Sequence, residues 1–174
     1  MPLAALFTDI PECYDLEVFQ HLLLQEIKRS LRYSEFFALL LVSVDPPGGE
    51  TPRGEADGGE MLLALMFDNV RQELRDTDFI GRYGHHLGVV LLHSSAEGTR
   101  VAAERVRERI GRFMFPSELT AGRPRMTVSV GGACFPTDGQ DLSSLLQRAF
   151  LSLRRAREVG GDRAVMYEEL NGGA

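Results

Sequence analysis

Apolar residues recur every three or four positions in four segments of the chain, a period typical of helices that pack one face on a core. The first segment is the clearest, because Phe19, Leu23, Ile27 and Leu31 fall at intervals of four. The predicted helices are residues 15–33, 61–74, 97–113 and 141–158. Aspartates that begin helices accept the free N–H groups of the first turn, and the caps expected on this ground are Asp15 and Asp141.

Shorter apolar segments between these helices predict five strands. Residues 36–44 form a nearly continuous apolar run, which suits a strand buried on both faces. Two runs separated by Gly84-His85-His86 indicate a hairpin. The predicted strands are residues 36–44, 79–83, 87–92, 126–135 and 163–167. A hairpin among β-α-β units predicts an α/β (α+β) fold with a ferredoxin-like core, in which helices flank a mixed, mostly antiparallel five-stranded sheet.

These elements are expected to form one domain. Residues 1–14 lack a clear period and predict an irregular lead-in, residues 15–168 the domain, and residues 169–174 a C-terminal tail. Residues 48–59 are rich in glycine and acidic residues and predict a loop within the domain, because they are too few for an interdomain linker. We expect no sensor domain before Asp15, since the lead-in is too short to hold one.

Composition narrows the classes of function. The chain has 174 residues and a formal net charge of −6, which disfavours binding to nucleic acid through its phosphates. No apolar run approaches the roughly 18–20 residues that span a bilayer, and no basic start with an apolar core marks a signal peptide. Two cysteines make neither a disulfide framework nor a four-ligand zinc site. We therefore expect a cytoplasmic protein without membrane insertion and without a bound metal.

Five strings follow one another along the chain, and the first is Arg82-Tyr83-Gly84-His85-His86-Leu87-Gly88. The others are Ala103-Glu104-Arg105-Val106-Arg107, Thr127-Val128-Ser129-Val130-Gly131, Pro136-Thr137-Asp138-Gly139 and Leu145-Leu146-Gln147-Arg148-Ala149. In this order and at these distances they resemble the GGDEF family, the diguanylate cyclases, which condense two GTP molecules into cyclic di-GMP. The resemblance covers about residues 15–167, the first string stands where the family has R-Y-G-G-D-E-F, and it implies a cyclase-like palm.

At the positions that the resemblance implies for magnesium and GTP, the chain departs from the family. The signature reads Gly84, His85, His86, Leu87 and Gly88. Ser43 and His86 stand in place of the metal-binding carboxylates, and Thr51 in place of a guanine-binding asparagine, whereas Glu60 keeps an acidic group at another guanine-binding position. Magnesium prefers carboxylate oxygens, and phosphoryl transfer needs it to neutralise developing charge. We therefore expect a catalytically inactive, degenerate GGDEF-type domain with no cofactor.

Many cyclases of this family carry a product-binding inhibitory site, the I-site, with the pattern R-x-x-D. Arg75 and Asp78 have this pattern, and Arg75 lies nine residues before Gly84, as in the family. The resemblance implies that Arg105 supports the site and that Arg29 joins it from a neighbouring domain. Arginine forks match the guanine edge or paired phosphate oxygens. These residues therefore predict binding of cyclic di-GMP.

The residues leave three hypotheses for the function open. In the first, the inactive domain is a cyclic di-GMP receptor that regulates a protein partner or pairs with a second copy of itself. In the second, it is a nucleotide-independent interaction scaffold, because residues 46–59 replace the active-site loop. In the third, it keeps GTP affinity through Glu60 without turnover. A purely structural role for Arg75 and Asp78 is the alternative to the I-site, as a surface ion pair at a helix end.

Overall fold

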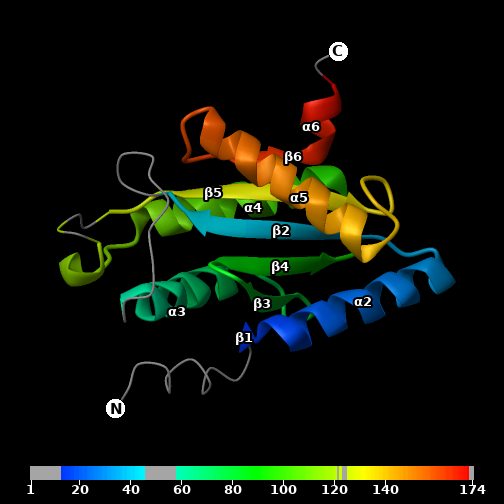
Figure 1. The fold of residues 1–174 in the computed structure, drawn as a ribbon, viewed down its shortest axis with the longest axis horizontal. Coiled ribbons are helices and arrows are strands. Elements are labelled where there is room, and N and C mark those ends of the chain that lie inside the picture. The colour runs from blue at the N-terminus through cyan, green and yellow to red at the C-terminus, as the bar shows by residue number, and fades with distance from the viewer. Residues whose placement is uncertain (1–12, 46–57, 121, 123–124, 173–174) are drawn as a thin grey trace.

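The computed structural model of the protein describes residues 13–45, 58–120, 122 and 125–172. The strands are β1 (Cys13–Tyr14), β2 (Phe37–Val44), β3 (Phe79–Tyr83), β4 (His86–Leu92), β5 (Val128–Phe135) and β6 (Ala164–Met166). The helices are α2 (Leu16–Tyr33), α3 (Gly58–Arg71), α4 (Ala96–Arg112), α5 (Leu142–Glu158) and α6 (Tyr167–Asn171), with the short 3-10 helix η2 (Ser117–Leu119). Helices cover both faces of a single sheet (Figure 1), which confirms the predicted architecture.

The strands lie in the order β1-β3-β4-β2-β5-β6. The central strand β2 runs antiparallel to β4 and β5, β3 and β4 form the predicted hairpin, and only the two edge strands pair in parallel. The sheet has six strands and not the predicted five. The additional strand, β1, pairs Cys13 with Ile80 and Tyr14 with Gly81. Two residues are too few to show an alternating pattern, so the sequence assigned them to the irregular lead-in.

The core lies on both faces of β2, as its apolar run predicts. Leu40 and Val42 pack with α3 and α4 on one face, and Leu39 and Leu41 pack with α2 and α5 on the other. All four side chains are fully buried. Because neither face of the strand meets water, the sequence of β2 does not alternate between apolar and polar residues, and Ser43 is its one polar residue.

Helix α2 is held against the sheet by one aromatic side chain. Phe19 lies over Gly81 of β3 and Gly88 of β4, which face each other across the hairpin. A Cβ atom at these glycines would lie 2.3 Å and 2.5 Å from the Phe19 ring, so only glycine leaves room for it. The predicted cap of this helix is confirmed, because the Asp15 carboxylate accepts a hydrogen bond from the Val18 N–H at 2.9 Å.

Helix α3 ends at Arg71, three residues before its predicted end. The apolar period suggested a longer helix because it included Leu74, which packs against the core from the turn that follows the helix. The Leu74 N–H donates to the Arg71 carbonyl at 3.2 Å, which closes a tighter turn than an α-helix has. This early end places the segment from residue 72 to residue 78 outside the helix.

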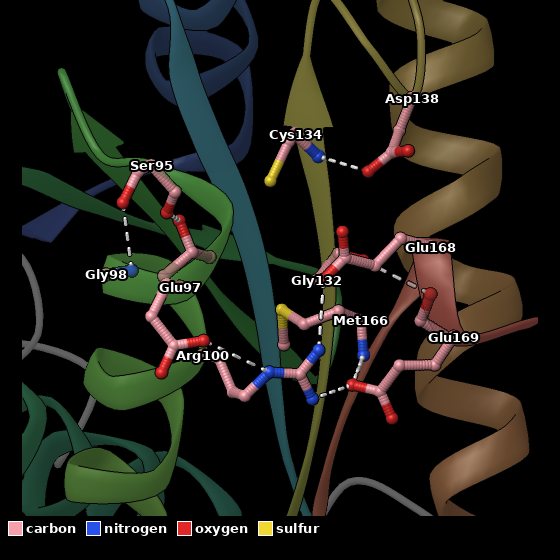
Figure 2. Close-up of polar contacts among 12 residues, drawn as sticks. Ser95, Glu97, Gly98, Arg100, Gly132, Cys134, Asp138, Met166, Glu168 and Glu169 are labelled. Atoms are coloured by element: carbon pink, nitrogen blue, oxygen red, sulfur yellow. Dashed lines mark hydrogen bonds and ion pairs between the residues drawn. The ribbon is translucent and has the colours of Figure 1, made fainter. Parts of the chain in front are cut away.

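The C-terminal residues form helix α6 where the sequence predicted the end of a strand and a tail. Arg100 of α4 holds this helix, because its guanidinium pairs with Glu168 at 3.0 Å and with Glu169 (Figure 2). The Glu169 carboxylate also accepts from the Met166 N–H at 3.2 Å and so caps the helix. Within the described ranges, no helix is both long and apolar enough to cross a membrane.

Candidate functional site

The R-x-x-D segment forms a tight turn between α3 and β3, and Asp78 holds it. The Asp78 N–H donates to the Arg75 carbonyl at 3.1 Å, and one carboxylate oxygen of Asp78 accepts from the Arg75 N–H at 3.0 Å. The other carboxylate oxygen accepts from the Leu92 N–H at the end of β4, also at 3.0 Å. Asp78 is only 7% exposed. Its carboxylate therefore joins the turn to the sheet, and the surface ion pair between Asp78 and the Arg75 guanidinium is not formed.

The Arg75 guanidinium is presented to solvent on this turn. The residue is exposed, and in the described ranges its side chain makes no hydrogen bond or ion pair. Arg71 also stabilises the turn, because its guanidinium donates to the carbonyls of Arg75 at 3.0 Å and Asp78 at 3.4 Å. An arginine with unsatisfied donors on a backbone fixed at both ends is suited to bind an external acceptor.

Arg105 reaches the same segment from α4. Its Nε donates to the Glu73 carboxylate at 3.1 Å and its terminal nitrogen to the Glu73 carbonyl at 2.9 Å. Arg109, one helical turn later, donates to the second carboxylate oxygen of Glu73 at 3.0 Å. Burial raises the pKa of Glu73, but hydrogen bonds from Arg109 and Arg105 outweigh it, and the net pKa lies below its ordinary value. The resemblance did not include Arg109, although its i+4 spacing from Arg105 places both on one helix face.

Arg29 does not join these residues within one chain. It lies on α2, which covers the face of the sheet opposite to α4. Its guanidinium makes a two-pronged pair with Glu26 at 3.0 Å and 2.7 Å and also contacts Glu35. Donation of Arg29 to the site of a neighbouring domain stays a prediction, and it would require these internal pairs to open.

Two hollows flank the R-x-x-D turn. One of about 360 Å³ lies between α3 and α4 and is lined by Glu73, Arg105 and Arg109. The other, of about 300 Å³, lies between α2 and the turn and is lined by Tyr14 and Asp78 among others. The sequence predicted one site from Arg75, Asp78 and Arg105, and the structure places them around a single turn but on two sides of it.

Gly84 and His85, at the start of the signature string, form the turn at the other end of β3. His86 Nδ1 lies 2.9 Å from the Ser43 hydroxyl of β2. Arg157 of α5 donates to the same hydroxyl and to the Val44 carbonyl at 3.2 Å. Since a guanidinium only donates, Ser43 accepts from Arg157 and can give its own proton to His86, which favours the neutral Nε2–H form of the imidazole.

The environment of His86 favours this neutral form. The Phe150 ring packs edge-on against the imidazole, with the ring centroids 5.6 Å apart. Burial, followed by the charges of Arg157 and His85, lowers the pKa of His86 from 6.5 to about 4. The imidazole is therefore uncharged near neutral pH and stays bonded to Ser43.

The carboxylate of Asp45, which follows β2, is occupied by the protein itself. One of its oxygens accepts from the Thr127 hydroxyl and the Asp162 N–H, both at 2.8 Å, and the other accepts from the Ser129 hydroxyl. These bonds join the ends of β2 and β5 to the loop before β6. Thr51 lies outside the described residues, as does the side chain of Glu60, so the third hypothesis is not tested.

Comparison with known proteins agrees with this geometry. Residues 14–163 match the family described as "Diguanylate cyclase, GGDEF domain". The chain belongs to the GGDEF family.

Curated GGDEF relatives are much longer than this chain. It is 27% identical over 147 residues to the bifunctional diguanylate cyclase/cyclic di-GMP phosphodiesterase MucR of Pseudomonas aeruginosa. The matched residues make up 83% of this chain and 21% of MucR. Diguanylate cyclase DgcP of the same organism is 34% identical over 108 residues, 60% of this chain and 15% of DgcP. The chain thus spans about a fifth of the length of the first relative and less of the second.

Solved GGDEF structures share the fold. The GGDEF domain of DgcB from Caulobacter crescentus, solved in complex with c-di-GMP, superposes with a TM-score of 0.75 at 18% identity and covers 90% of this chain and 92% of its own. Diguanylate cyclase SiaD from Pseudomonas aeruginosa, solved with its activator SiaC, gives 0.74 at 24% identity over 87% of this chain and 58% of SiaD. Identities this low show the architecture alone.

Ser43, Asp45, His86 and Arg157 lie together beside the signature turn, and we call this region the signature edge. The magnesium that a GGDEF cyclase implies does not fit it. The two positions that the family pattern gives to carboxylates hold a hydroxyl, on Ser43, and an imidazole, on His86. The Arg157 guanidinium already contacts Ser43, and the Asp45 carboxylate is bonded to other protein groups. A hard cation needs oxygen ligands of negative charge, and a neighbouring guanidinium repels it. Among the described residues, no group of three or more acidic, histidine or cysteine side chains is arranged to hold a metal.

Proposed function

We propose that this GGDEF domain has lost cyclase activity and acts as a receptor for cyclic di-GMP, through which it regulates a partner protein. The observation that carries the receptor role is the Arg75 guanidinium, exposed and without a partner among the described residues, on a turn fixed by Asp78. Arg105 contacts the same segment from α4 and supplies a second guanidinium. Loss of activity rests on the signature edge, where His86 and Arg157 both bond to the Ser43 hydroxyl.

The chemistry of the ligand matches these groups. Cyclic di-GMP carries two guanines, each with adjacent O6 and N7 acceptors, and two phosphodiesters with paired oxygens. A guanidinium donates two parallel N–H bonds to either arrangement and can also stack on a base. Asp78 has a different role from the one expected from the R-x-x-D pattern. Because both of its oxygens accept backbone N–H groups, it fixes the direction of Arg75 and leaves the guanidiniums to bind the ligand.

Calorimetric titration with cyclic di-GMP tests the receptor role. Arg75→Ala should weaken binding by about tenfold to a hundredfold, because a charge-assisted hydrogen bond is worth about 1.5–3 kcal/mol. Arg154→Ala is the matched control, since it removes another exposed arginine, on α5, which packs on the other face of the sheet. Equal affinity of wild type and Arg75→Ala, or no saturable binding by wild type, would contradict the proposal.

Incubation with GTP and magnesium tests the loss of cyclase activity. We expect no cyclic di-GMP from the wild-type protein, because the signature edge lacks the carboxylates that would hold the metal. An active GGDEF cyclase assayed in parallel confirms that the reagents are competent. Product formation above the background without protein would refute this half of the proposal and leave the receptor role to be judged by calorimetry.

The second candidate function is a nucleotide-independent scaffold, and exposed apolar side chains at the end of α2 favour it. Leu31 and Tyr33 are 57% and 61% exposed, and Phe36 beside them is 46% exposed. In this case a partner or a second copy of the chain would bind there with equal affinity in the presence and absence of cyclic di-GMP. Sedimentation of wild type and Tyr33→Ser, each with and without the nucleotide, separates the two functions.

A further inference from the structure

Glu73 occupies Arg105 of the proposed receptor site and also its neighbour on α4, Arg109. Its carboxylate accepts from Arg105 at 3.1 Å on one oxygen and from Arg109 at 3.0 Å on the other, while its carbonyl accepts from Arg105 at 2.9 Å. The second terminal nitrogen of Arg109 donates to the Gln72 side chain. Two guanidiniums, one helical turn apart on α4, therefore converge on a single acidic group at the edge of the 360 Å³ hollow.

This arrangement differs from an ordinary surface ion pair. The Glu73 side chain is 18% exposed, whereas the Arg112 and Glu108 pair at the rim of the same hollow has side chains 80% and 48% exposed. The Nε–H of Arg109 is buried and has no hydrogen-bond partner among the described residues. A buried donor without an acceptor is costly. It indicates that an additional acceptor fits beside Arg109 when the hollow is filled.

A carboxylate and a phosphodiester present the same pattern to arginine, two equivalent oxygens that share a negative charge. Arginine forks bind both in the same two-pronged geometry. The Glu73 carboxylate therefore holds the place that a phosphate oxygen pair of a ligand would take. On the basis of the proposed receptor function, we propose that Arg109 is a further ligand-binding residue of this site and that Glu73 is a built-in competitor, which a phosphodiester ligand must displace.

Displacement of Glu73 also has a consequence for the turn. Glu73 lies two residues before Arg75, and its carbonyl and carboxylate are the contacts by which Arg105 holds this segment to α4. A ligand that takes over Arg105 and Arg109 breaks the carboxylate contacts and leaves the turn tied to the sheet through Asp78. The segment between α3 and Arg75 is then free to change its surface, which gives ligand binding a route to a partner protein.

Two charge-matched pairs of variants test this inference. Glu73→Gln keeps the shape of the side chain but removes its charge, and Asp76→Asn removes one charge from a fully exposed position of the same turn. Arg109→Ala removes the further ligand-binding residue, and Arg112→Ala removes the exposed arginine at the rim. Each protein is titrated by calorimetry with cyclic di-GMP and, separately, with pyrophosphate, and thermal melting shows that each variant is folded.

We expect Glu73→Gln to bind both probes about threefold to tenfold more tightly than wild type. Asp76→Asn should change the affinity less than twofold, because only Glu73 competes with the ligand for the guanidiniums of Arg105 and Arg109. Arg109→Ala should weaken both probes more than Arg112→Ala does. Tighter pyrophosphate binding by Glu73→Gln without any cyclic di-GMP binding would support the inference while refuting the receptor proposal. Affinities of Glu73→Gln no higher than those of Asp76→Asn, or no binding of either probe by any variant, would overturn the inference.

Discussion

Acidification should destabilise this domain through His86. The unfolded chain protonates its imidazole near pH 6.5, whereas burial and the charges of Arg157 and His85 lower the pKa of the folded form to about 4. Between these two values the unfolded state binds more protons than the folded state. The free energy of unfolding must therefore fall as the pH falls through this window. Well above pH 6.5 the imidazole is neutral in both states, so His86 lowers the free energy of unfolding only on acidification.

The size of the effect follows from the two pKa values. A difference of this magnitude corresponds to about 3 kcal/mol once the pH lies below both values. Between pH 7 and pH 4.5 the folded state should lose about 2 kcal/mol through this group alone. That is a large share of the roughly 5–15 kcal/mol by which a domain is stable.

Urea unfolding at pH 7, 5.5 and 4.5 measures this loss. His86→Asn keeps a polar atom near the position of Nδ1 without a titrating group, so the difference between wild type and variant isolates His86 from the carboxylates that titrate in the same range. His21→Asn, at an exposed position of α2, is the control and should follow the wild type. Parallel curves for wild type and His86→Asn, or an imidazole resonance of His86 that titrates above pH 6, would refute this reasoning.

Three further variants test packing and contacts. Phe19→Ala should lower the free energy of unfolding by about 3–5 kcal/mol, because the ring fills the space above two facing glycines; denaturation in urea measures this, and a loss below about 1 kcal/mol would contradict it. Gly131→Ala should cost about 1–3 kcal/mol, since the added Cβ would lie 2.2 Å from the Leu153 nitrogen of α5, and an unchanged melting temperature would argue against that contact. Arg100→Ala should cost under about 1 kcal/mol but speed hydrogen exchange in α6, and unchanged exchange there would show that other contacts hold the helix.

The sequence predicted the long elements because burial on one or two faces leaves a periodic pattern. Residues 36–44 predicted a strand buried on both faces, and β2 is one. Two of the short elements were missed for the converse reason. β1 has two residues and α6 has five, too few for a period to appear. Their positions depend on partners far away in the chain, β3 for the first and Arg100 for the second.

At the candidate site, residue spacing located the turn but not the role of each side chain. The pattern placed Arg75 and Asp78 together, and they do share one turn. It suggested that Asp78 binds a ligand, whereas its carboxylate accepts two backbone N–H groups. Spacing along the chain does not show which backbone donors a buried carboxylate will meet. The contact of Arg109 with this segment was missed because it depends on Glu73, a residue 36 positions earlier that only the packing of α3 on α4 brings near.

The proposed function requires that catalysis can be lost while a binding site is kept, and the distance between the two regions supports this. Both candidate regions adjoin β3, since Asp78 immediately precedes the strand and the degenerate signature follows it. A strand of five residues separates them by about 17 Å, a distance at which changes at one site usually leave the energetics of the other unaffected. At the signature end, Arg157 takes up the Ser43 hydroxyl and the Val44 carbonyl, so a guanidinium is used inside the protein. At the other end the Arg75 guanidinium faces solvent on a turn that Asp78 keeps fixed without Arg75's side chain. None of the contacts that fix the Arg75 turn comes from the signature end, so the proposed loss of catalysis would leave this turn intact.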